Sequence, residues 1–401
     1  MTRRTLISCL FVLACLFPAT FTRDAQAYDV WGWLRALSAD HSTPLVEASN
    51  GGLRVDVVVE GLESPWGMVF LPDGRILVTE RPGRLRVVAN GVLLPDPLPG
   101  VPEVSYRGRA GQGGLLDIAL HPGFARNSLI YLAYTVDTPE GEMTCVSRHV
   151  LGPKGLSQAE IVFPGFPGGK NSKHFGSRIA FGRDGMLYVT LGERGEGRRA
   201  QDLMDLNGKT LRLKDDGSIP QDNPFVGVEN ARPEIFTYGN RNSQGMAVHP
   251  ETGMIVQTEH GPTWNDAPGG GDEVNIIKPG LNYGWPVIHH RQTSPGMIPP
   301  LLEYTPAIAP AGAAFLTGDL FPGWRHDFFF ACLRGEKLVR VKFDGETPVE
   351  QEFLLEGKFG RLRDVSGGPD GALYVLTSST DAYGPGRTGG DMLLRLSPAD
   401  R

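Results

Sequence analysis

Residues 178–193 read RIAFGRDGMLYVTLGE, and this stretch decides the fold. An apolar segment leads into the dipeptide Asp184-Gly185, and a second apolar segment follows it. Asp-Gly between runs of alternating apolar residues is typical of a β-hairpin with a tight turn. The stretch therefore predicts two short antiparallel strands.

The same pattern of strand, turn and strand recurs along the chain. Its six copies are residues 66–80, 115–135, 178–193, 245–260, 313–332 and 362–378. Their turn glycines lie 48 to 70 residues apart, a spacing that suits one four-stranded propeller blade per copy. The sequence thus predicts an all-β fold, a six-bladed β-propeller that forms a single domain over residues 53–398. A large β-sandwich, the alternative, does not explain the recurrence.

The composition of the 401-residue chain agrees with many short strands. It contains 53 glycines and 32 prolines, a load that long helices do not tolerate, because an interior Gly costs about 1 kcal/mol and an interior Pro about 3 kcal/mol. The net charge is −6, which argues against a surface for nucleic acid phosphates or anionic membranes. We therefore expect no nucleic acid partner.

The first 27 residues have the features of a secretory signal peptide. Arg3 and Arg4 form a basic start, the apolar run 6–17 is too short to span a bilayer, and residues 25–27 read Ala-Gln-Ala, a typical cleavage site. We expect cleavage before Tyr28, with residues 28–52 as a lead-in segment. The mature protein is then periplasmic or secreted, without stable membrane insertion.

The cysteines restrict the alternatives. Residues 12–15, Val-Leu-Ala-Cys, loosely resemble a lipoprotein box, but the apolar run continues past them. Removal of the signal peptide leaves only Cys145 and Cys332, each in an apolar, strand-like run. Two cysteines do not make a disulfide framework, so we expect two buried free thiols.

Polar residues gather just before the first strand of several repeats. His174 precedes the third copy and could act as a general base or as a structural hydrogen-bonding residue. Arg361 and Arg363 flank the start of the sixth copy, and residues two apart on a strand share a face. Two such guanidinium groups suit a ligand with several carboxylates, or they are an exposed edge-strand pair.

Further polar residues occupy the equivalent place in other repeats. Arg241 and Asn242 precede the fourth copy, and Gln112 precedes the second. A shared ring of entry loops at one end of a central channel explains this arrangement.

Residues 259–285 are rich in oxygen donors, glycine and proline. Carboxylates, and carbonyls freed by turns, are the ligands that Ca²⁺ prefers. The spacing is not that of an EF-hand, so the stretch is a calcium loop or a long polar loop. No zinc pattern, P-loop or GxSxG elbow occurs in the chain.

Taken together, several stretches resemble the soluble pyrroloquinoline quinone (PQQ) dependent sugar dehydrogenases, the glucose/sorbosone dehydrogenase family, and its aldose-type branch in particular. The resemblance covers residues 53–398. The stretches that carry it are LESPWGMVFLPDGRILVTERPGRL, GQGGLLDIALHPGF, HFGSRIAF, YGNRNSQGMAVHP, EHGP, GDEVNIIKPGLNYGWP and GRLRDVSGGPDGALYVLT.

The resemblance implies a six-bladed propeller, with PQQ and Ca²⁺ as cofactors at the mouth of its channel. It implies oxidation of the anomeric carbon of an aldose sugar to a lactone, with hydride transfer to PQQ C5 and electrons passed to an external acceptor such as a cytochrome, quinone or dye. His174 matches the base, and Arg241 also stabilises the charge that develops on the quinone. The implied cofactor contacts are Gln112, Arg241, Asn242, Arg334, Arg361 and Arg363.

The resemblance also implies two calcium sites. The carbonyls of Gly261 and Pro262 match the ligands of the catalytic Ca²⁺. Asp272, Glu273 and Tyr283 match a second, structural site.

Two positions depart from the family pattern. Lys173 stands before the His where the glucose enzymes carry an acidic residue, which points to the aldose-type branch. Arg334 stands where the family often has Lys, so a single ammonium becomes a planar fork.

Two other functions remain as alternatives. A lactonase-type calcium hydrolase would hold its metal mainly by side-chain carboxylates. A non-catalytic extracellular binding propeller would lack the set of His174, Arg241, Arg361 and Arg363, which this chain retains.

Overall fold

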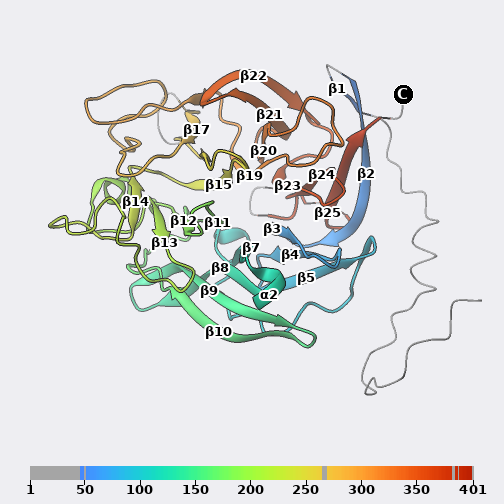
Figure 1. Ribbon diagram of the computed structural model, residues 1–401, viewed down its shortest axis with the longest axis horizontal. Helices are drawn as coiled ribbons and strands as arrows, with labels where there is room; N and C mark the ends of the chain where they lie inside the picture. The colour runs from blue at the N-terminus through green and yellow to red at the C-terminus, as the bar shows by residue number, and fades with distance from the viewer. Residues whose placement is uncertain (1–45, 49–50, 264–268, 382–383, 387, 400–401) are drawn as a thin grey trace, which may run out of the picture. The chain divides into compact units, whose positions relative to one another are not determined.

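The computed structural model describes residues 46–48, 51–263, 269–381, 384–386 and 388–399. They form six antiparallel sheets, five of four strands and one of five. Figure 1 shows the sheets arranged around a common centre. The predicted six-bladed β-propeller is therefore confirmed, while the predicted signal peptide, residues 1–27, lies outside the described residues.

The first three blades each contain four strands, named from the innermost outward. Blade 1 consists of β3 (Pro65–Phe70), β4 (Ile76–Glu80), β5 (Arg84–Ala89) and β6 (Val92–Leu93). Blade 2 consists of β7 (Leu115–Leu120), β8 (Leu129–Thr138), β9 (Gly141–Gly152) and β10 (Gly155–Phe163). Blade 3 consists of β11 (Gly176–Phe181), β12 (Leu187–Leu191), β13 (Lys209–Leu213) and β14 (Ile235–Tyr238).

The remaining blades follow the same order. Blade 4 consists of β15 (Ser243–Val248), β16 (Ile255–Glu259), β17 (Asp272–Ile276) and β18 (Leu302–Tyr304). Blade 5 consists of β19 (Pro310–Phe315), β20 (Phe328–Cys332), β21 (Lys337–Asp344) and β22 (Thr347–Leu354). Blade 6 consists of β23 (Leu362–Gly367), β24 (Leu373–Thr377), β25 (Asp391–Pro398), β2 (Gly51–Leu62) and β1 (Val46–Ala48).

Blade 6 closes the ring by joining the two ends of the described chain. Strand β2 pairs antiparallel with β25, with Leu53 opposite Pro398 and Leu62 opposite Asp391. Figure 1 shows β2, in blue, beside β25, in red. The inner strands β3, β7, β11, β15, β19 and β23 contact one another in sequence around the centre. The radial arrangement leaves only short inner edges, which the neighbouring blades protect.

Each of the six repeats forms the two innermost strands of one blade. In the hairpin of blade 1, the amide of Arg75 donates to Asp73 Oδ1 and Gly74 adopts φ of +87°, a conformation that glycine tolerates and that Asp-Gly turns require. All five residues of β4, β12, β13, β16 and β20 are buried, whereas the outermost strand β22 is mostly exposed. Strands packed between neighbouring blades bury both faces, so their polar residues are buried along with the apolar ones.

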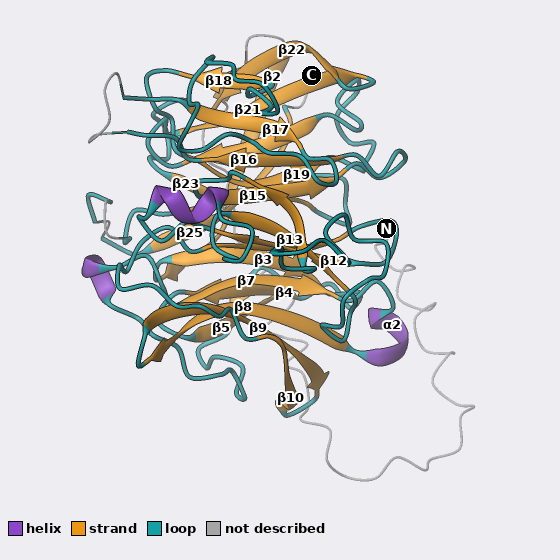
Figure 2. Ribbon diagram, turned by 90° about the vertical axis from the view of Figure 1, so that its left-hand side faces the viewer, coloured by secondary structure: helices purple, strands orange, loops and turns teal. Residues whose placement is uncertain are grey.

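In the part of the chain that the structure describes, helical structure is limited to short segments in loops: η1 (Gly108–Ala110), α2 (Phe124–Asn127) and η2 (Gly197–Gln201). Figure 2 shows these turns outside the sheets. Among the described residues, no helix has the length and apolar character needed to cross a membrane. Cys145 and Cys332 are buried free thiols, as the sequence predicted.

Candidate active site at the mouth of the channel

A cavity of about 880 Å³ opens at one end of the central channel. It is lined by residues that precede inner strands, such as Gln112, His174 and Arg241, and by residues that follow second strands, such as Glu193 and His260. Antiparallel pairing places the start of an inner strand and the end of the second strand at the same edge of each blade. The ring of entry loops that the sequence predicted is therefore present.

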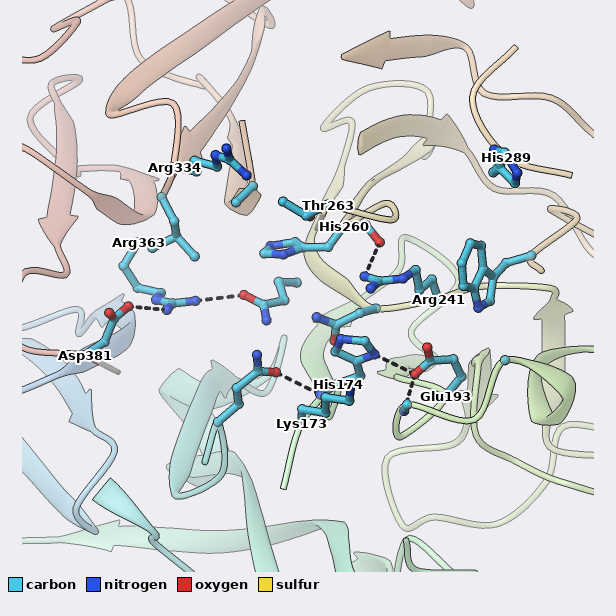
Figure 3. Close-up of a pocket in the computed structure, with 18 of the residues that line it drawn as sticks. Lys173, His174, Glu193, Arg241, His260, Thr263, His289, Arg334, Arg363 and Asp381 are labelled. Atoms are coloured by element: carbon cyan, nitrogen blue, oxygen red, sulfur yellow. Dashed lines mark hydrogen bonds and ion pairs between the residues drawn. The ribbon is translucent and has the colours of Figure 1, made fainter. Parts of the chain in front are cut away.

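The cavity brings together every predicted cofactor-binding side chain. Seven of its lining residues were predicted as catalytic or cofactor-binding: Gln112, His174, Arg241, Asn242, Arg334, Arg361 and Arg363. Figure 3 shows several of them directed toward a common space from different blades. Their contribution to binding or catalysis remains a prediction that this geometry supports.

His174 lies in a strained and closely held loop. Its φ is +54°, a left-handed conformation that is uncommon for a residue other than glycine and often marks a functional site. Its backbone N–H donates to Gln112 Oε1 at 2.8 Å. The guanidinium of Arg194, itself almost fully buried, donates to the carbonyls of Lys173, at 3.0 Å, and Asn171. These contacts fix the loop, and so the imidazole, against the strain.

Glu193 orients the imidazole of His174. Its Oε2 lies 2.7 Å from His174 Nδ1 and also accepts the Gly195 N–H at 2.6 Å (Figure 3). A carboxylate at this distance favours the tautomer with the proton on Nδ1, which leaves the Nε2 lone pair for a ligand. The arrangement is that of a general base with a fixed orientation.

Burial lowers the pKa of His174, and Arg241 and Lys173 lower it further, although Glu193 opposes them. Burial alone would raise the pKa of Glu193, but the hydrogen bond from His174 and the charges of His174 and Arg241 outweigh it and lower that pKa. At neutral pH the pair therefore consists of a neutral imidazole and a carboxylate, the state that a base requires.

Arg361 and Arg363 point to the same side, as their spacing predicted. Each donates to Oδ2 of Asp381 at 3.1 Å. Their side chains are only 11% and 7% exposed, so they are not the exposed edge-strand pair of the alternative interpretation. Burial alone would raise the pKa of Asp381, but Arg363 and Arg361 lower it to about 2. Arg363 also donates to Gln244 Oε1 at 2.8 Å.

Several buried nitrogens around the cavity lack hydrogen-bond partners among the described residues. They are the Nε atoms of Arg241, Arg361 and Arg363, Nε2 of His260, and Nε1 of Trp285. A buried polar atom without a partner costs about 1–3 kcal/mol, so such a group in a cavity indicates a ligand that supplies the partner. A cluster of five such atoms indicates a ligand rich in hydrogen-bond acceptors.

The charges around the cavity are strongly unbalanced. The cationic residues that line it are Arg81, Lys173, Arg198, Arg241, Arg334, Arg361 and Arg363. Among the described lining residues, Glu193 and Asp381 are the carboxylates. An anionic ligand would offset this excess of positive charge.

Gly261 and Pro262 lie between His260 and Thr263, which both line the cavity. The N–H of Gly261 donates to Asp272 Oδ1 at 2.8 Å, and a side chain at Gly261 would overlap the Gly271 carbonyl, 2.0 Å away. Only glycine therefore allows this close crossing of two backbone segments.

The residues predicted for a second calcium site are not brought together by their side chains. Asp272 accepts the backbone N–H groups of Gly261, Ile308 and Ala309. Glu273, the next residue on β17, faces the other way and accepts from Asn275 Nδ2 at 2.9 Å. The hydroxyl of Tyr283 donates to the carbonyl of Ile276 at 2.7 Å. The calcium site remains a prediction.

Sequence reasoning missed part of the site. It singled out neither Glu193 nor His260 nor Asp381, although each follows the second strand of a repeat and lines the cavity. The available signal was their position at repeat ends, opposite the residues that precede the inner strands.

Comparisons with known proteins agree with the geometry. The profile of the family described as Glucose / Sorbosone dehydrogenase matches residues 62–384. Aldose sugar dehydrogenase YliI of Escherichia coli is 37% identical, over 88% of this chain and 94% of that protein. Quinoprotein glucose dehydrogenase B of Acinetobacter calcoaceticus is 27% identical, over 86% of this chain and 91% of that protein.

A solved structure is also similar. The PQQ-bound aldose sugar dehydrogenase of Streptomyces coelicolor is 34% identical, and the match covers 86% of this chain and 98% of that one with a TM-score of 0.74. The family match spans most of the chain, and the relatives align over nearly their full lengths. The chain therefore belongs to the glucose/sorbosone dehydrogenase family.

Proposed function

We propose that this protein is a PQQ- and calcium-dependent dehydrogenase that oxidises the anomeric carbon of aldose sugars to lactones. The observation that carries the proposal is a cavity that combines an oriented imidazole base with buried guanidinium nitrogens that have no hydrogen-bond partner among the described residues. The predicted signal peptide, residues 1–27, supports action in the periplasm or outside the cell, with electrons passed to an external acceptor.

The cavity fits PQQ in charge and in hydrogen bonding. PQQ carries three carboxylates. The Nε atoms of Arg241, Arg361 and Arg363 lack a partner within the described structure and are donors that carboxylates would satisfy. Gln112, Asn242 and Arg334 line the same space and could complete the contacts. When bound, PQQ supplies a quinone that takes up two electrons as a hydride.

The segment Gly261–Pro262 fits a hard cation such as Ca²⁺. Its carbonyl oxygens belong to the ligand class that Ca²⁺ prefers. The Gly261 carbonyl accepts the Thr263 hydroxyl at 3.2 Å, which is long for an O–H···O bond. Asp272 holds the backbone of this segment from behind. In this proposal the segment holds the catalytic Ca²⁺ at the edge of the cavity.

His174 is the base in this proposal. Its Nε2 takes the proton of the anomeric hydroxyl while the hydrogen on C1 leaves as hydride. Glu193 stabilises the imidazolium that forms, because its carboxylate lies 2.7 Å from Nδ1. Arg241 keeps a fixed positive charge beside the site, which stabilises negative charge as it develops.

The site contacts favour this function over a calcium-dependent hydrolase. The hydrolase requires carboxylates that are available to a metal. The carboxylates among the described lining residues are committed to other partners, Glu193 to His174 and Asp381 to the two arginines. A binding propeller, in turn, has no use for a base held by a carboxylate.

The test is reconstitution. Purified apo protein is titrated with PQQ in excess Ca²⁺, and dye reduction is measured across a panel of aldoses. We expect activity only with both cofactors, and no activity with NAD(P). Turnover by metal-stripped, PQQ-free protein at the same rate would contradict the proposal.

The variant His174→Ala separates catalysis from binding. We expect it to lose turnover by about 10²- to 10⁴-fold, the usual contribution of a general base, and to bind PQQ as wild type by absorbance titration. His121→Ala, in the turn between β7 and β8 at the other end of the sheet, is the control. Turnover of the His174 variant within a few-fold of wild type would assign that residue a structural role.

A further inference from the structure

Three of the cations that line the cavity have no part in the proposed chemistry. Arg81 donates to the carbonyls of Gly111 and Gly113, which leaves Lys173 and Arg198. Both line the cavity, both are exposed, and both come from loops of blade 3 that also carry His174 and Glu193. Within the described part of the chain, neither side chain forms an ion pair or a hydrogen bond. No partner among the described residues therefore offsets their charge at the mouth of the cavity.

The side chain of Lys173 is seated beside the base. A Cβ at Gly195 would lie 2.5 Å from Lys173 Cε, so the lysine stem packs directly over this glycine. The N–H of Gly195 bonds to Glu193, the partner of His174 (Figure 3). The charge of Lys173 also lowers the pKa of His174, behind the larger effect of burial. The ammonium group thus lies over Gly195, on the part of the cavity wall that also carries His174 and Glu193.

Arg198 belongs to a segment that is packed into the wall of the cavity. It lies on η2, whose first residue, Gly197, approaches Pro286 and Trp285 so closely that a Cβ there would lie 3.1–3.2 Å from both. Trp285 and Pro286 also line the cavity. The contact holds the backbone of Arg198 at the rim.

The charge balance leaves room for a second anion. The seven cations that line the cavity exceed its two described carboxylates by five charges. A tricarboxylate cofactor offsets three of these charges, and a bound Ca²⁺ would add two positive ones. Lys173 and Arg198 contribute two of the remaining charges, on the loops that also carry His174 and Glu193.

We propose that the substrate is an acidic aldose, which carries a carboxylate or phosphate that Lys173 and Arg198 bind while its anomeric hydroxyl lies on His174. This proposal rests on the proposed function and specifies its substrate class. The reaction is the same two-electron oxidation: the hydroxyl proton passes to His174, the hydride passes to the quinone, and the lactone forms without a further co-reactant.

The experiment compares D-glucuronate with D-glucuronamide, its neutral isostere, on the reconstituted holoenzyme. Exposed charge pairs contribute up to about fivefold each, so we expect kcat/KM for the acid to exceed that for the amide by about tenfold. High salt should reduce the preference. D-glucose 6-phosphate and D-glucose form a second pair, which distinguishes a phosphate from a carboxylate.

Variants locate the effect. In the double variant Lys173→Gln/Arg198→Gln, we expect the ratio of kcat/KM for D-glucuronate to kcat/KM for D-glucuronamide to fall close to one. Lys154→Gln removes an exposed cation from the β9–β10 turn and should leave the ratio as in wild type. An unchanged ratio in the double variant would overturn the assignment to these two residues.

A binding measurement makes the test independent of turnover. Methyl β-D-glucuronide has no free anomeric hydroxyl, so the holoenzyme can bind it without oxidising it. Calorimetry should show that the holoenzyme binds methyl β-D-glucuronide more tightly than methyl β-D-glucoside. In the double variant the two affinities should be equal. Equal kcat/KM for acidic and neutral aldoses, with equal binding, would overturn this inference and leave the proposed function intact. Absence of PQQ-dependent oxidation of any aldose would contradict the proposed function itself.

Discussion

The centre of the channel and its mouth both enclose arginines, but they balance the charge in opposite ways. At the centre, Arg178 lies between Asp117, 2.9 Å from Nη1, and Asp364, 3.1 Å from Nη2. At the mouth, Arg361 and Arg363 share one oxygen of Asp381. At the centre, two carboxylates surround one guanidinium group. In this part of the mouth, two guanidinium groups share one carboxylate.

The charge at the centre is balanced without a ligand, although Nη2 of Arg178 forms only its ion pair and no hydrogen bond within the described residues. Arg178 Nε also donates to the Gln244 carbonyl at 2.9 Å, and its guanidinium lies 4.4 Å from the centre of the Trp66 ring. Asp117 and Asp364 accept backbone N–H groups of neighbouring blades. Burial raises the pKa of Asp117 to about 7, although Arg178 opposes the rise. This cluster connects blades, so its function is structural.

The mouth lacks this internal balance. Within the described residues, the Nε atoms of Arg361 and Arg363 are buried without a partner, and the carboxylate that they share is already ionised. Desolvated charge without compensation is unfavourable unless a ligand supplies it. A buried arginine therefore indicates a ligand site when the carboxylates of the protein do not balance its charge.

The largest expected effect is on the centre. Arg178→Met leaves Asp117 and Asp364 buried without their cation, and breaking a buried ion pair costs about 3–5 kcal/mol. We expect the free energy of unfolding to fall by this amount in urea titrations at pH 8. Arg361→Met is the control. Asp381 keeps Arg363, and the substitution removes the repulsion between the two guanidinium groups, so the change should stay below about 1 kcal/mol. Equal losses in both variants would refute the distinction between centre and mouth.

The repeat pattern could predict the fold and half of the site. Asp-Gly turns between apolar runs locate the two inner strands of each blade, and the residues just before them, such as His174 and Arg241, line the cavity. Placing these residues at the cavity requires only the direction of the inner strand that follows them, which the sequence pattern of one repeat indicates. The resemblance to a known family then supplied roles for these residues.

The other half of the site depends on pairing that the pattern does not specify. Glu193, His260 and Asp381 follow second strands, and their loops differ in length and course. Whether such a residue turns toward the channel also depends on contacts between blades, such as the hydrogen bond from Arg194 to the Glu142 carbonyl of blade 2, at 2.7 Å. In the same way the pattern does not specify that Asp272 accepts the backbone N–H of Ile308, which precedes blade 5.

The next prediction concerns the mouth. Arg361→Met removes one charge-assisted contact to a carboxylate of the cofactor, worth about 1.5–3 kcal/mol. We expect the dissociation constant of PQQ to rise about 10- to 100-fold. The turnover number at saturating PQQ should change little, because this contact is equal in the ground and transition states. The measurement is a PQQ titration of apo protein in excess Ca²⁺. Unchanged affinity would leave Arg361 without a role in the cofactor site.

The smallest expected effect concerns the tuning of the base by Glu193. Burial, Arg241 and Lys173 lower the pKa of His174, and the Glu193 carboxylate opposes them. Glu193→Gln keeps the shape of the side chain but removes its charge, so the pKa of His174 should fall further. Because activity needs the neutral imidazole, kcat is lost as pH falls through this pKa. The acid limb of the profile should therefore move to lower pH in the variant.

The same substitution should lower the plateau of kcat. A base of lower pKa is weaker, and the amide does not stabilise the imidazolium as the carboxylate does. The measurement is kcat from about pH 4 to 8, on either side of the ordinary histidine pKa, at saturating aldose, with Glu196→Gln, a neighbouring exposed carboxylate, as the control. If Glu193 has only a structural role, the variant should yield less active enzyme, and the acid limb of its kcat profile should stay at the same pH. An unmoved limb with an unchanged plateau would show that the carboxylate at 2.7 Å from Nδ1 does not tune His174.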